Sequence, residues 1–417
     1  MKNTLEKLIN DSTSREIKLK GDINLFVESS NVISIGKSVV RKIITINRPD
    51  IVIDGANSTI KVEIDDNVNI DTDIALFYVS GLAKNICLKN MKIYIYVKNQ
   101  KDLTKTFYAI YNGAIGTRLE NCTIELMSQN QMNLIGIYNC ADISTHMETC
   151  ADNLVVSNCN IKVRCCTESF TKECNVYGIY NHLGNSISVQ NNFIYARNRG
   201  VGESQRAFGV YTSGRFGRFI GNNIKACSSH PEGKIREQGS SFGFYNEGYF
   251  SIITSNNIIG EWAGMSIGIE NRKGYAKISS NKILATHAIR GIGIKNYAEK
   301  CIIDGNIITS TSRNPRLIES YGTECIITNN YIDAVLETDI CVTGCGIYLR
   351  GNVKGTIIKD NIIKNLKDCG ILAERNAGII KDNIITSDSK KFIDYVETTN
   401  LEMLNRLSEK NIRSIID

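Results

Sequence analysis

Two short motifs alternate along residues 242–296 and decide the fold: FGFYN at 242–246, SNNI at 255–258, IGIEN at 267–271, SNKI at 280–283 and IGIKN at 292–296. The first motif also occurs as YAIYN at 108–112, IGIYN at 135–139, YGIYN at 177–181 and FGVYT at 208–212. A motif that recurs roughly every 20 to 50 residues is typical of a repeat architecture. The recurring motifs therefore predict a fold built from stacked repeats.

The second motif is an asparagine followed within three residues by isoleucine. Its first asparagines are Asn90, Asn121, Asn158, Asn191, Asn222, Asn256, Asn281, Asn306, Asn329, Asn361 and Asn383. The steps run from 22 residues, between Asn361 and Asn383, to 37 residues, between Asn121 and Asn158. Each step holds short alternating runs rich in isoleucine, valine and tyrosine, which predict strands. Because such strands cannot bury their faces alone, they must stack coil on coil into long parallel sheets.

The predicted fold is thus an all-β, parallel β-helix, a solenoid spanning residues 15–388. We expect a capping helix at residues 1–14 and a helical cap at 389–417, since an open solenoid end invites edge-to-edge association. The predicted helix starts are capping boxes, and each is followed by an apolar stripe. These residues are Asn3, Glu6, Leu5, Leu8 and Ile9 at the start, and Thr399, Glu402, Leu401, Leu404 and Leu407 at the finish.

Asparagines at a fixed corner of each coil predict ladders, in which each amide bonds to its equivalent above and below. One ladder would contain Asn112, Asn139, Asn181, Asn246, Asn271 and Asn296. The first asparagines of the second motif would form another. Both ladders are interpreted as structural.

The composition is that of a globular protein, with 42% hydrophobic and 22% charged residues. The net charge of +6 is spread among 43 acidic residues without a block of like charge, which disfavours nucleic acid as a partner. The first residues lack the apolar core of a secretory signal, and no run approaches the length that spans a bilayer. We therefore expect a cytoplasmic protein with no membrane partner.

The 14 cysteines are interpreted as free thiols, because a chain of this length has a core and needs no disulfides. Five of them stand in or beside strand segments, where cysteine acts as a small hydrophobe. These are Cys87, Cys122, Cys159, Cys301 and Cys325. No grouping has the spacing of a zinc site, and no aspartate cluster suggests calcium. We predict no metal and no cofactor.

The xGxYN and NxI coils resemble the right-handed parallel β-helix repeats of the pectin-lyase-like superfamily over roughly residues 15–390. The resemblance implies a right-handed solenoid. It does not specify an activity, because that superfamily includes polysaccharide lyases, glycoside hydrolases, uronan epimerases, tailspikes and proteins without known chemistry.

Period-2 alternation within xGxYN predicts two outward stripes. One is a glycine stripe of Ala109, Gly136, Gly178, Gly209, Gly243, Gly268 and Gly293. The other is an aromatic stripe of Tyr111, Tyr138, Tyr180, Tyr211 and Tyr245, continued by Glu270 and Lys295. A glycine floor beside tyrosines suits a sugar chain, whose apolar ring faces stack on aromatics. The alternative is that loops or another subunit cover the stripe.

Long turns follow the second motif at 197–206, 228–241, 260–265, 286–291 and 310–316. Stacked coils would gather their polar residues on one flank, where loops on a rigid scaffold commonly carry function. The flank would hold His230, Glu232, Arg236, Glu237, Glu261, Trp262, His287, Arg290 and Arg313.

A lyase or epimerase of uronic acids needs a cation for the carboxylate, a base and an acid. A hydrolase needs two carboxylates, for which Glu270 would pair with Glu247 or Glu261. The candidate catalytic residues are Glu270, Lys295, His230, Arg236 and His182, and the candidate substrate-binding residues are Tyr180, Tyr211, Tyr245, Trp262 and Arg290.

YGIYNH at 177–182 is similar to the catalytic YGxDPH segment of alginate epimerases, with Tyr177 and His182 in matching places. Tyr180 and Asn181 stand where that segment has Asp and Pro, and YGIYN is also a copy of the coil motif. We interpret this match as chance.

The sequence thus leaves two hypotheses. The first is a carbohydrate-active protein, a lyase, epimerase or hydrolase, with its ligand on the glycine and tyrosine face. The second is a non-catalytic solenoid for partner binding or assembly, like a tailspike or scaffold module. A homo-oligomer is left open under both.

Overall fold

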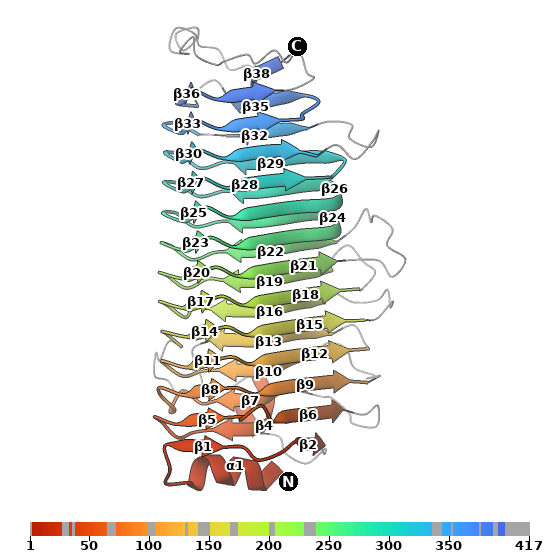
Figure 1. Ribbon diagram of the computed structural model, residues 1–417, viewed down its shortest axis with the longest axis vertical. Coiled ribbons are helices and arrows are strands. Elements are labelled where there is room, and N and C mark those ends of the chain that lie inside the picture. Colours follow the sequence, from red (N-terminus) through yellow and green to blue (C-terminus); the bar gives the residue numbers. More distant parts are fainter. Residues whose placement is uncertain are drawn as a thin grey trace.

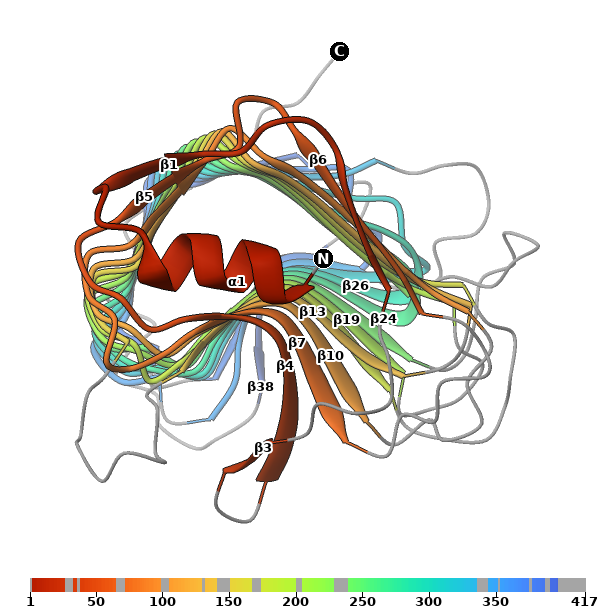
Figure 2. The same cartoon turned by 90° about the horizontal axis from the view of Figure 1, so that it is seen from below.

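The computed structural model describes residues 2–26, 33–35, 38–64, 72–98, 105–129, 132–140, 151–166, 174–199, 205–228, 239–335, 344–351, 353–374, 377–386 and 391–396. These residues form one right-handed parallel β-helix (Figure 1). In Figure 2 the chain passes clockwise from β5 through β6 to β7 as the coils recede from the viewer. The predicted fold class is confirmed.

Three stacks of parallel strands make up the rod. The first stack is a 13-stranded sheet of three-residue strands: β1 (Glu16–Lys18), β5 (Val52–Asp54), β8 (Cys87–Lys89), β11 (Arg118–Glu120), β14 (Val155–Ser157), β17 (Ser188–Gln190), β20 (Arg218–Ile220), β23 (Ile252–Thr254), β25 (Lys277–Ser279), β27 (Ile302–Asp304), β30 (Ile326–Thr328), β33 (Ile357–Lys359) and β36 (Ile379–Lys381).

The second stack follows the first in each coil. Its strands are β2 (Ile23–Phe26), β6 (Thr59–Ile64), β9 (Lys92–Val97), β12 (Thr123–Ser128), β15 (Asn160–Cys165), β18 (Phe193–Asn198), β21 (Asn223–Ser228), the first parts of β24 (Asn257–Asn271) and β26 (Lys282–Asn296), β28 (Ile307–Ser310), β31 (Tyr331–Ala334), β34 (Ile362–Lys364) and β37 (Ile384–Thr386).

The third stack closes each coil. Its strands are β4 (Ser38–Ile46), β7 (Asp73–Val79), β10 (Thr106–Asn112), β13 (Asn133–Cys140), β16 (Asn175–His182), β19 (Arg206–Thr212), β22 (Ser240–Asn246), the last parts of β24 and β26, β29 (Asn314–Ser320), β32 (Cys345–Leu349), β35 (Cys369–Glu374) and β38 (Lys391–Val396). The short β3 (Ile33–Ile35) pairs antiparallel with β4. Because β24 and β26 run through both stacks, the second and third stacks join into one 25-stranded sheet.

Helix α1 (Lys2–Asp11) lies across the N-terminal end of the rod (Figures 1 and 2). Leu5 and Ile9 are buried against the core, whereas Leu8, expected on the same face, is exposed. Asn10 fixes the helix to β4, since its Nδ2 donates to the Thr45 carbonyl at 2.8 Å. The side chain of Asn3 and residues 397–417 lie outside the described part, and β38 lies within the segment 389–417 that was expected to be helical.

The interior is aliphatic because the strands turn isoleucine, valine and leucine side chains inward. The described cysteines are all free thiols, as expected, and Cys122, Cys159, Cys301 and Cys325 are buried among core residues.

The first predicted asparagine ladder is confirmed. Its members are fully buried, and Nδ2 of each donates to Oδ1 of the next at 2.6 to 2.7 Å, from Asn112 to Asn139 to Asn181 and from Asn246 to Asn271 to Asn296. Thr212 stands between the two runs and accepts from Asn181 at 3.0 Å. The ladder satisfies buried amides at the end of the third stack.

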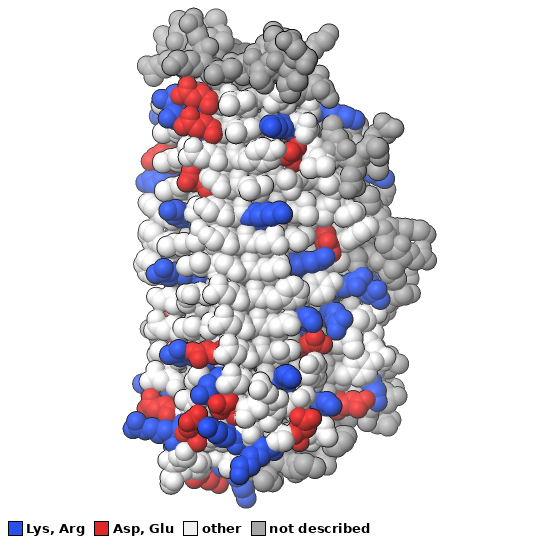
Figure 3. All heavy atoms as spheres, viewed as in Figure 1, with Lys and Arg blue, Asp and Glu red and all other residues white. Residues whose placement is uncertain are grey.

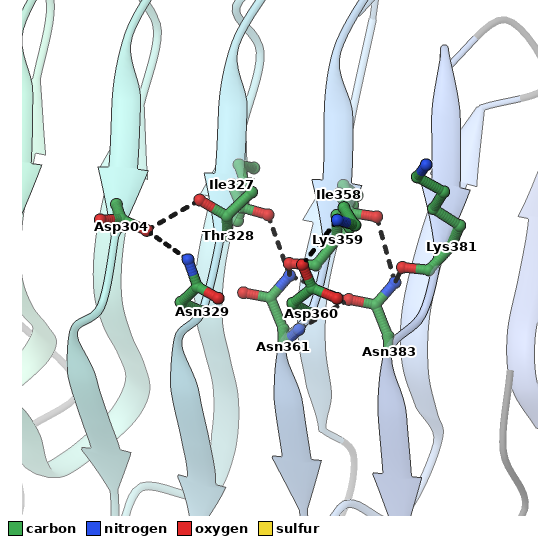
Figure 4. A network of polar contacts seen from close by, with 10 residues as sticks. All are labelled: Asp304, Ile327, Thr328, Asn329, Ile358, Lys359, Asp360, Asn361, Lys381 and Asn383. Carbon is green, nitrogen blue, oxygen red and sulfur yellow. Dashed lines mark hydrogen bonds and ion pairs between the residues drawn. The ribbon is translucent and has the colours of Figure 1, made fainter.

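The second ladder is real but was partly assigned to the wrong residues. It runs through Asn192, Asn222, Asn256, Asn281, Asn306, Asn330, Asn361 and Asn383 (Figure 4 shows its last members). Five of the predicted members instead stand one residue before the ladder position of their coil and have positive φ, between 52° and 56°. They are Asn90, Asn121, Asn158, Asn191 and Asn329. Asparagine is one of the few residues that adopt this left-handed geometry readily, so these five form the tight turn itself.

Figure 3 shows the face of the rod made by the first and second stacks, opposite the third stack. Its charged side chains gather near the N-terminal end and are sparse along the middle. Ile302, Ile326 and Ile379 lie exposed on the first stack. Among the described residues no helix is long and apolar enough to cross a membrane.

Candidate functional site on the third stack

The glycines of xGxYN mark a bend in each strand of the third stack, and the prediction that they lie on the outer face is wrong. A Cβ added at Gly136 would lie 2.9 Å from Ile161 Cγ2 and 3.0 Å from Val163 Cγ2, both core atoms. It would also lie 2.6 Å from the Gly178 carbonyl oxygen in the next coil. The following Ile137 is buried in the core as well. Two successive residues thus turn inward, because the strand changes direction at the glycine.

The concave side of this bend faces outward and is filled by aromatic rings. Residues on either side of the glycine contact each other, with ring centroids 4.8 Å apart for Tyr177 and Tyr180 and 5.4 Å apart for Phe242 and Tyr245. Such contacts three residues apart within a strand require a sharp bend. The bottom of the bend is therefore an apolar cluster outside the main core.

The outward residue after the bend forms one column in register along the rod, which we call the tyrosine face. Its members are Tyr78, Tyr111, Tyr138, Tyr180, Tyr211, Tyr245, Glu270, Lys295, Glu319 and Tyr348. The structure thus brings Tyr180, Tyr211 and Tyr245 onto successive coils, and Glu270 and Lys295 onto the next two.

The tyrosines pack mainly on one another. Tyr180 and Tyr211 meet edge to face at 4.6 Å, and Tyr211 and Tyr245 stack at 5.0 Å. Burial raises the pKa of Tyr177, Tyr211 and Tyr245 above the ordinary phenol value. These phenols therefore stay protonated near neutral pH, where they can donate hydrogen bonds but do not act as bases.

Glu247 lies beside the tyrosine face, directly after β22, and accepts hydrogen bonds from two of its members. The Tyr245 hydroxyl donates to Glu247 Oε1 at 3.2 Å, and the Tyr211 hydroxyl donates to Oε2. This carboxylate thus organises two phenols of neighbouring coils.

Glu270 is buried and paired with Arg272, whose Nε donates to its Oε1 at 2.7 Å. The Arg272 guanidinium also lies 5.4 Å from the Tyr245 ring centroid and 5.0 Å from that of Tyr297. Burial opposes the charge of Arg272, but the bond to Glu270 prevails and raises the pKa of Arg272. The arginine therefore links the tyrosine face to Tyr297 on the adjoining turn.

Lys295 stands between two carboxylates of the tyrosine face without pairing to either. Its neighbours in register are Glu270 and Glu319, yet within the described residues its ammonium forms no ion pair. Lys295 Nζ lies 4.9 Å from the Tyr297 ring centroid, a cation–π contact. This ammonium is therefore available to an anion brought from solution.

Glu319 is fully buried and is the most strongly bound carboxylate of the site. Arg290 Nη2 donates to both of its oxygens at 2.9 Å, and Arg316 Nη1 donates at 2.8 Å. The Tyr321 hydroxyl donates to the same carboxylate at 2.7 Å. Arg290, predicted to bind substrate, is thus engaged by the protein itself.

His182 ends β16 and lies edge-on to Tyr180, with ring centroids 5.9 Å apart. Burial lowers the pKa of His182 below the ordinary histidine value, partly opposed by the charge of Glu247. Four strand pairings separate β16 from β26, so His182 and Lys295 lie about 19 Å apart at ~4.8 Å a coil. They do not share one catalytic centre.

Trp262 and His287 lie at another bend, where β24 and β26 pass from the second stack to the third. Their rings stack at 4.0 Å, and both residues have positive φ. Glu261 pairs with Lys225 at 2.7 Å on the second stack, so it is not the partner of Glu270. His230 and Arg236 lie outside the described residues.

The sequence did not predict four functional residues of this site, which are Arg272, Glu319, Arg316 and Tyr321. The coil register contained a signal for them, because Glu319 continues the column of Glu270 and Lys295 once NPRLIES at 314–320 is aligned with the preceding motif. That segment has Leu317 and Ser320 at the positions where other coils have the glycine and the asparagine of the motif.

The arrangement is suited to holding anions rather than to hydrolysis. Hydrolysis by a carboxylate pair needs one acid and one free base or nucleophile. Here Glu247, Glu270 and Glu319 each already accept hydrogen bonds from tyrosine or arginine. In the described part of the chain, no group of three or more His, Cys, Asp and Glu is placed to hold a metal.

Comparison with known proteins finds similar solved structures only. No family model matches the chain, and no curated protein matches it. The A-module of mannuronan C-5 epimerase AlgE6 from Azotobacter vinelandii aligns at 11% identity over 92% of this chain and 91% of its own, with a TM-score of 0.49. The periplasmic alginate epimerase AlgG aligns at 11% identity over 94% and 88%, with a TM-score of 0.40. The Dettilon tailspike protein aligns at 14% identity over 86% and 61%, with a TM-score of 0.40.

Proposed function

We propose that this chain is a carbohydrate-active protein that holds an acidic polysaccharide along the tyrosine face, over Arg272 and Lys295. The single observation that carries the proposal is the unpaired ammonium of Lys295. A lysine between two carboxylates that have other partners is a ready counter-charge for a ligand carboxylate.

The neighbouring groups supply the rest of such a site. Half-buried phenols along the column offer hydroxyl oxygens as acceptors for sugar hydroxyls, and exposed parts of their rings offer apolar contact. Arg272, which lies over two tyrosine rings, adds a second cation one coil before Lys295. The column runs along the rod, so its natural ligand is a chain rather than a single sugar.

The test measures binding of polygalacturonate, an acidic polysaccharide, against neutral dextran by affinity gel electrophoresis. Lys295→Gln should weaken retention by polygalacturonate at least fivefold and leave the thermal unfolding midpoint nearly unchanged. Lys277→Gln, on the first stack, is the matched control and should bind as the parent does. Equal retention of the parent by both polymers would refute an anionic ligand.

Catalysis is a second candidate function, and His182 favours it. A partly buried imidazole with a lowered pKa is neutral near pH 7 and suits a base that removes a proton next to a carboxylate. The lyase and epimerase alternatives both need such a base. Growth of absorbance at 235 nm during incubation with a uronan would identify the lyase, and its loss in His182→Gln would assign the base.

The non-catalytic solenoid is the alternative to these proposals, and a homo-oligomer remains a prediction. The surface to test for self-association is the exposed isoleucine column of the first stack, with Ile302, Ile326 and Ile379. Ile326→Lys should lower the mass measured by light scattering if this column joins two copies.

A further inference from the structure

The turn between the third and first stacks contains one residue of positive φ in coil after coil. The amide of this residue donates to the coil above, as for Phe216 N to the Tyr249 carbonyl at 3.0 Å and Phe250 N to the Gly274 carbonyl at 3.3 Å. The equivalent positions are Asp50, Asn85, Gly116, Asn153, Ser186, Phe216, Phe250, Tyr275, Lys300, Glu324 and Gly355.

Three successive coils place aromatic residues at this position, where most preceding coils have Asp, Asn, Gly or Ser. The φ values are 60° at Phe216, 58° at Phe250 and 61° at Tyr275. Bulky side chains rarely adopt this conformation, because Cβ then approaches the backbone. Burial does not offset the strain, since the three residues are 54%, 42% and 43% exposed. Strained, exposed aromatics of this kind point to a role outside folding.

The three rings form an offset stack, which we call the turn patch. Ring centroids lie 5.2 Å apart for Phe216 and Phe250 and 5.0 Å apart for Phe250 and Tyr275, with interplanar angles of 11° and 23°. Offset stacking at this spacing leaves part of each ring face uncovered. The patch therefore presents stepped apolar surfaces along the rod.

Cations surround the turn patch. Arg215 and Lys273 lie 6.0 Å and 5.4 Å from the ring centroid of Tyr249, which precedes Phe250. Lys300 Nζ lies 3.5 Å from the Tyr275 hydroxyl. None of these three cations forms an ion pair with a described residue. The patch thus combines ring faces with unpaired positive charge.

The turn patch continues from the tyrosine face on the same coils. Phe216 and Phe250 follow Tyr211 and Tyr245 by five residues each. Arg272, in the turn that leads to Tyr275, lies over the Tyr245 ring of the tyrosine face.

We propose that the turn patch is a second contact for the acidic polysaccharide held on the tyrosine face. This inference rests on the proposed function and extends it to a wider ligand, one long enough to reach the turn. Sugar ring faces pack on the stepped aromatics, and ligand carboxylates approach Arg215, Lys273 and Lys300. A single-stranded nucleic acid would also suit aromatic and basic groups, but continuity with the tyrosine face favours the polysaccharide.

The decisive variant is Phe250→Asn, because asparagine accepts positive φ more readily than phenylalanine. Its unfolding midpoint should be equal to or above that of the parent, while retention by long polygalacturonate falls at least threefold. A short oligogalacturonide, confined to the tyrosine face, should bind as before. Glu324→Asn is the matched control, since it changes the same turn position, with φ of 55°, outside the patch. It should leave binding unchanged.

A fall in the unfolding midpoint of Phe250→Asn would show the ring to be a packing residue and overturn the inference. Unchanged retention of the long polymer would overturn it as well, as would tighter binding of a poly(dT) oligonucleotide that Phe250→Asn abolishes. Loss of retention in Lys295→Gln but not in Phe250→Asn would reject the turn patch alone. No retention of the parent by polygalacturonate would reject the proposed function together with this inference.

Discussion

Replacing Gly243 by alanine tests whether the glycines of the third stack face the core. A Cβ there would lie 2.4 Å from Ile258 Cγ2 and 2.8 Å from the Gly268 carbonyl oxygen. Both distances are shorter than real Cβ contacts, and the second atom belongs to the backbone, so the coil must shift. Overpacking of this kind costs about 1–3 kcal/mol. In a chain of this size we expect a fall of about 1–3 °C in the unfolding midpoint.

Thermal unfolding followed by circular dichroism measures the change, with Ser240→Ala, an outward position of the same strand, as control. Ser240→Ala should stay within about 0.5 °C of the parent. Ile258→Ala removes the atom that Gly243→Ala meets, so the double variant should be more stable than the two single losses predict. If Gly243→Ala left the unfolding midpoint unchanged but abolished polysaccharide binding, the glycine would face outward under the ligand. That result would refute the inward orientation.

Three further outcomes follow from the geometry. Glu319→Gln should lower the free energy of unfolding by about 2–4 kcal/mol, because it leaves two arginines without their buried partner. Glu247→Gln should lower it by under about 1 kcal/mol, and equal unfolding midpoints of the two variants would contradict this. Asn271→Ala should cost about 2–3 kcal/mol through two lost ladder bonds and a cavity, against little for the partly exposed Asn257→Ala, as chemical denaturation can measure. The lowered pKa of His182 means that the unfolded state binds its proton first, so stability falls as pH drops below about 6.5; His182→Gln should reduce that slope, and an identical slope would contradict the assignment.

The fold could be predicted because the repeat recurs in most coils. Strand period, turn asparagines and coil spacing all indicated a parallel solenoid. The hydrogen bond between Asn112 and Asn139 could be predicted because both residues occupy the same position of the motif. Consistency among local signals is what makes such a prediction safe.

The orientation of the glycines could not be predicted, because strict alternation holds only in a straight strand. The bend at Gly136 turns both Gly136 and Ile137 inward, and nothing in IGIYN reveals it. The roles of two adjacent asparagines could not be told apart from the sequence either. In pairs such as Asn191 and Asn192, one makes the left-handed turn and the other the ladder, and both roles suit the same residue type.

The charged part of the site was predicted in outline only. Glu270 and Lys295 followed from the motif, but the partners that decide their chemistry come from outside it. Arg272 lies after the motif, and Glu319 lies in a coil that has lost the glycine and the asparagine. Side-chain pairing across coils depends on register, which single-sequence patterns do not give where the motif decays.

Because the central coils have equal lengths in sequence, the rod can be shortened by a whole number of coils. Asn256, Asn281 and Asn306 follow one another at 25 residues and bond directly in the second ladder. Excising residues 257–281 would join Asn256 to Lys282 and restore the same turn with one coil fewer. Each excised coil would shorten the surface available to a bound polymer by about 4.8 Å. The length of polymer that the rod can hold could therefore be changed one coil at a time.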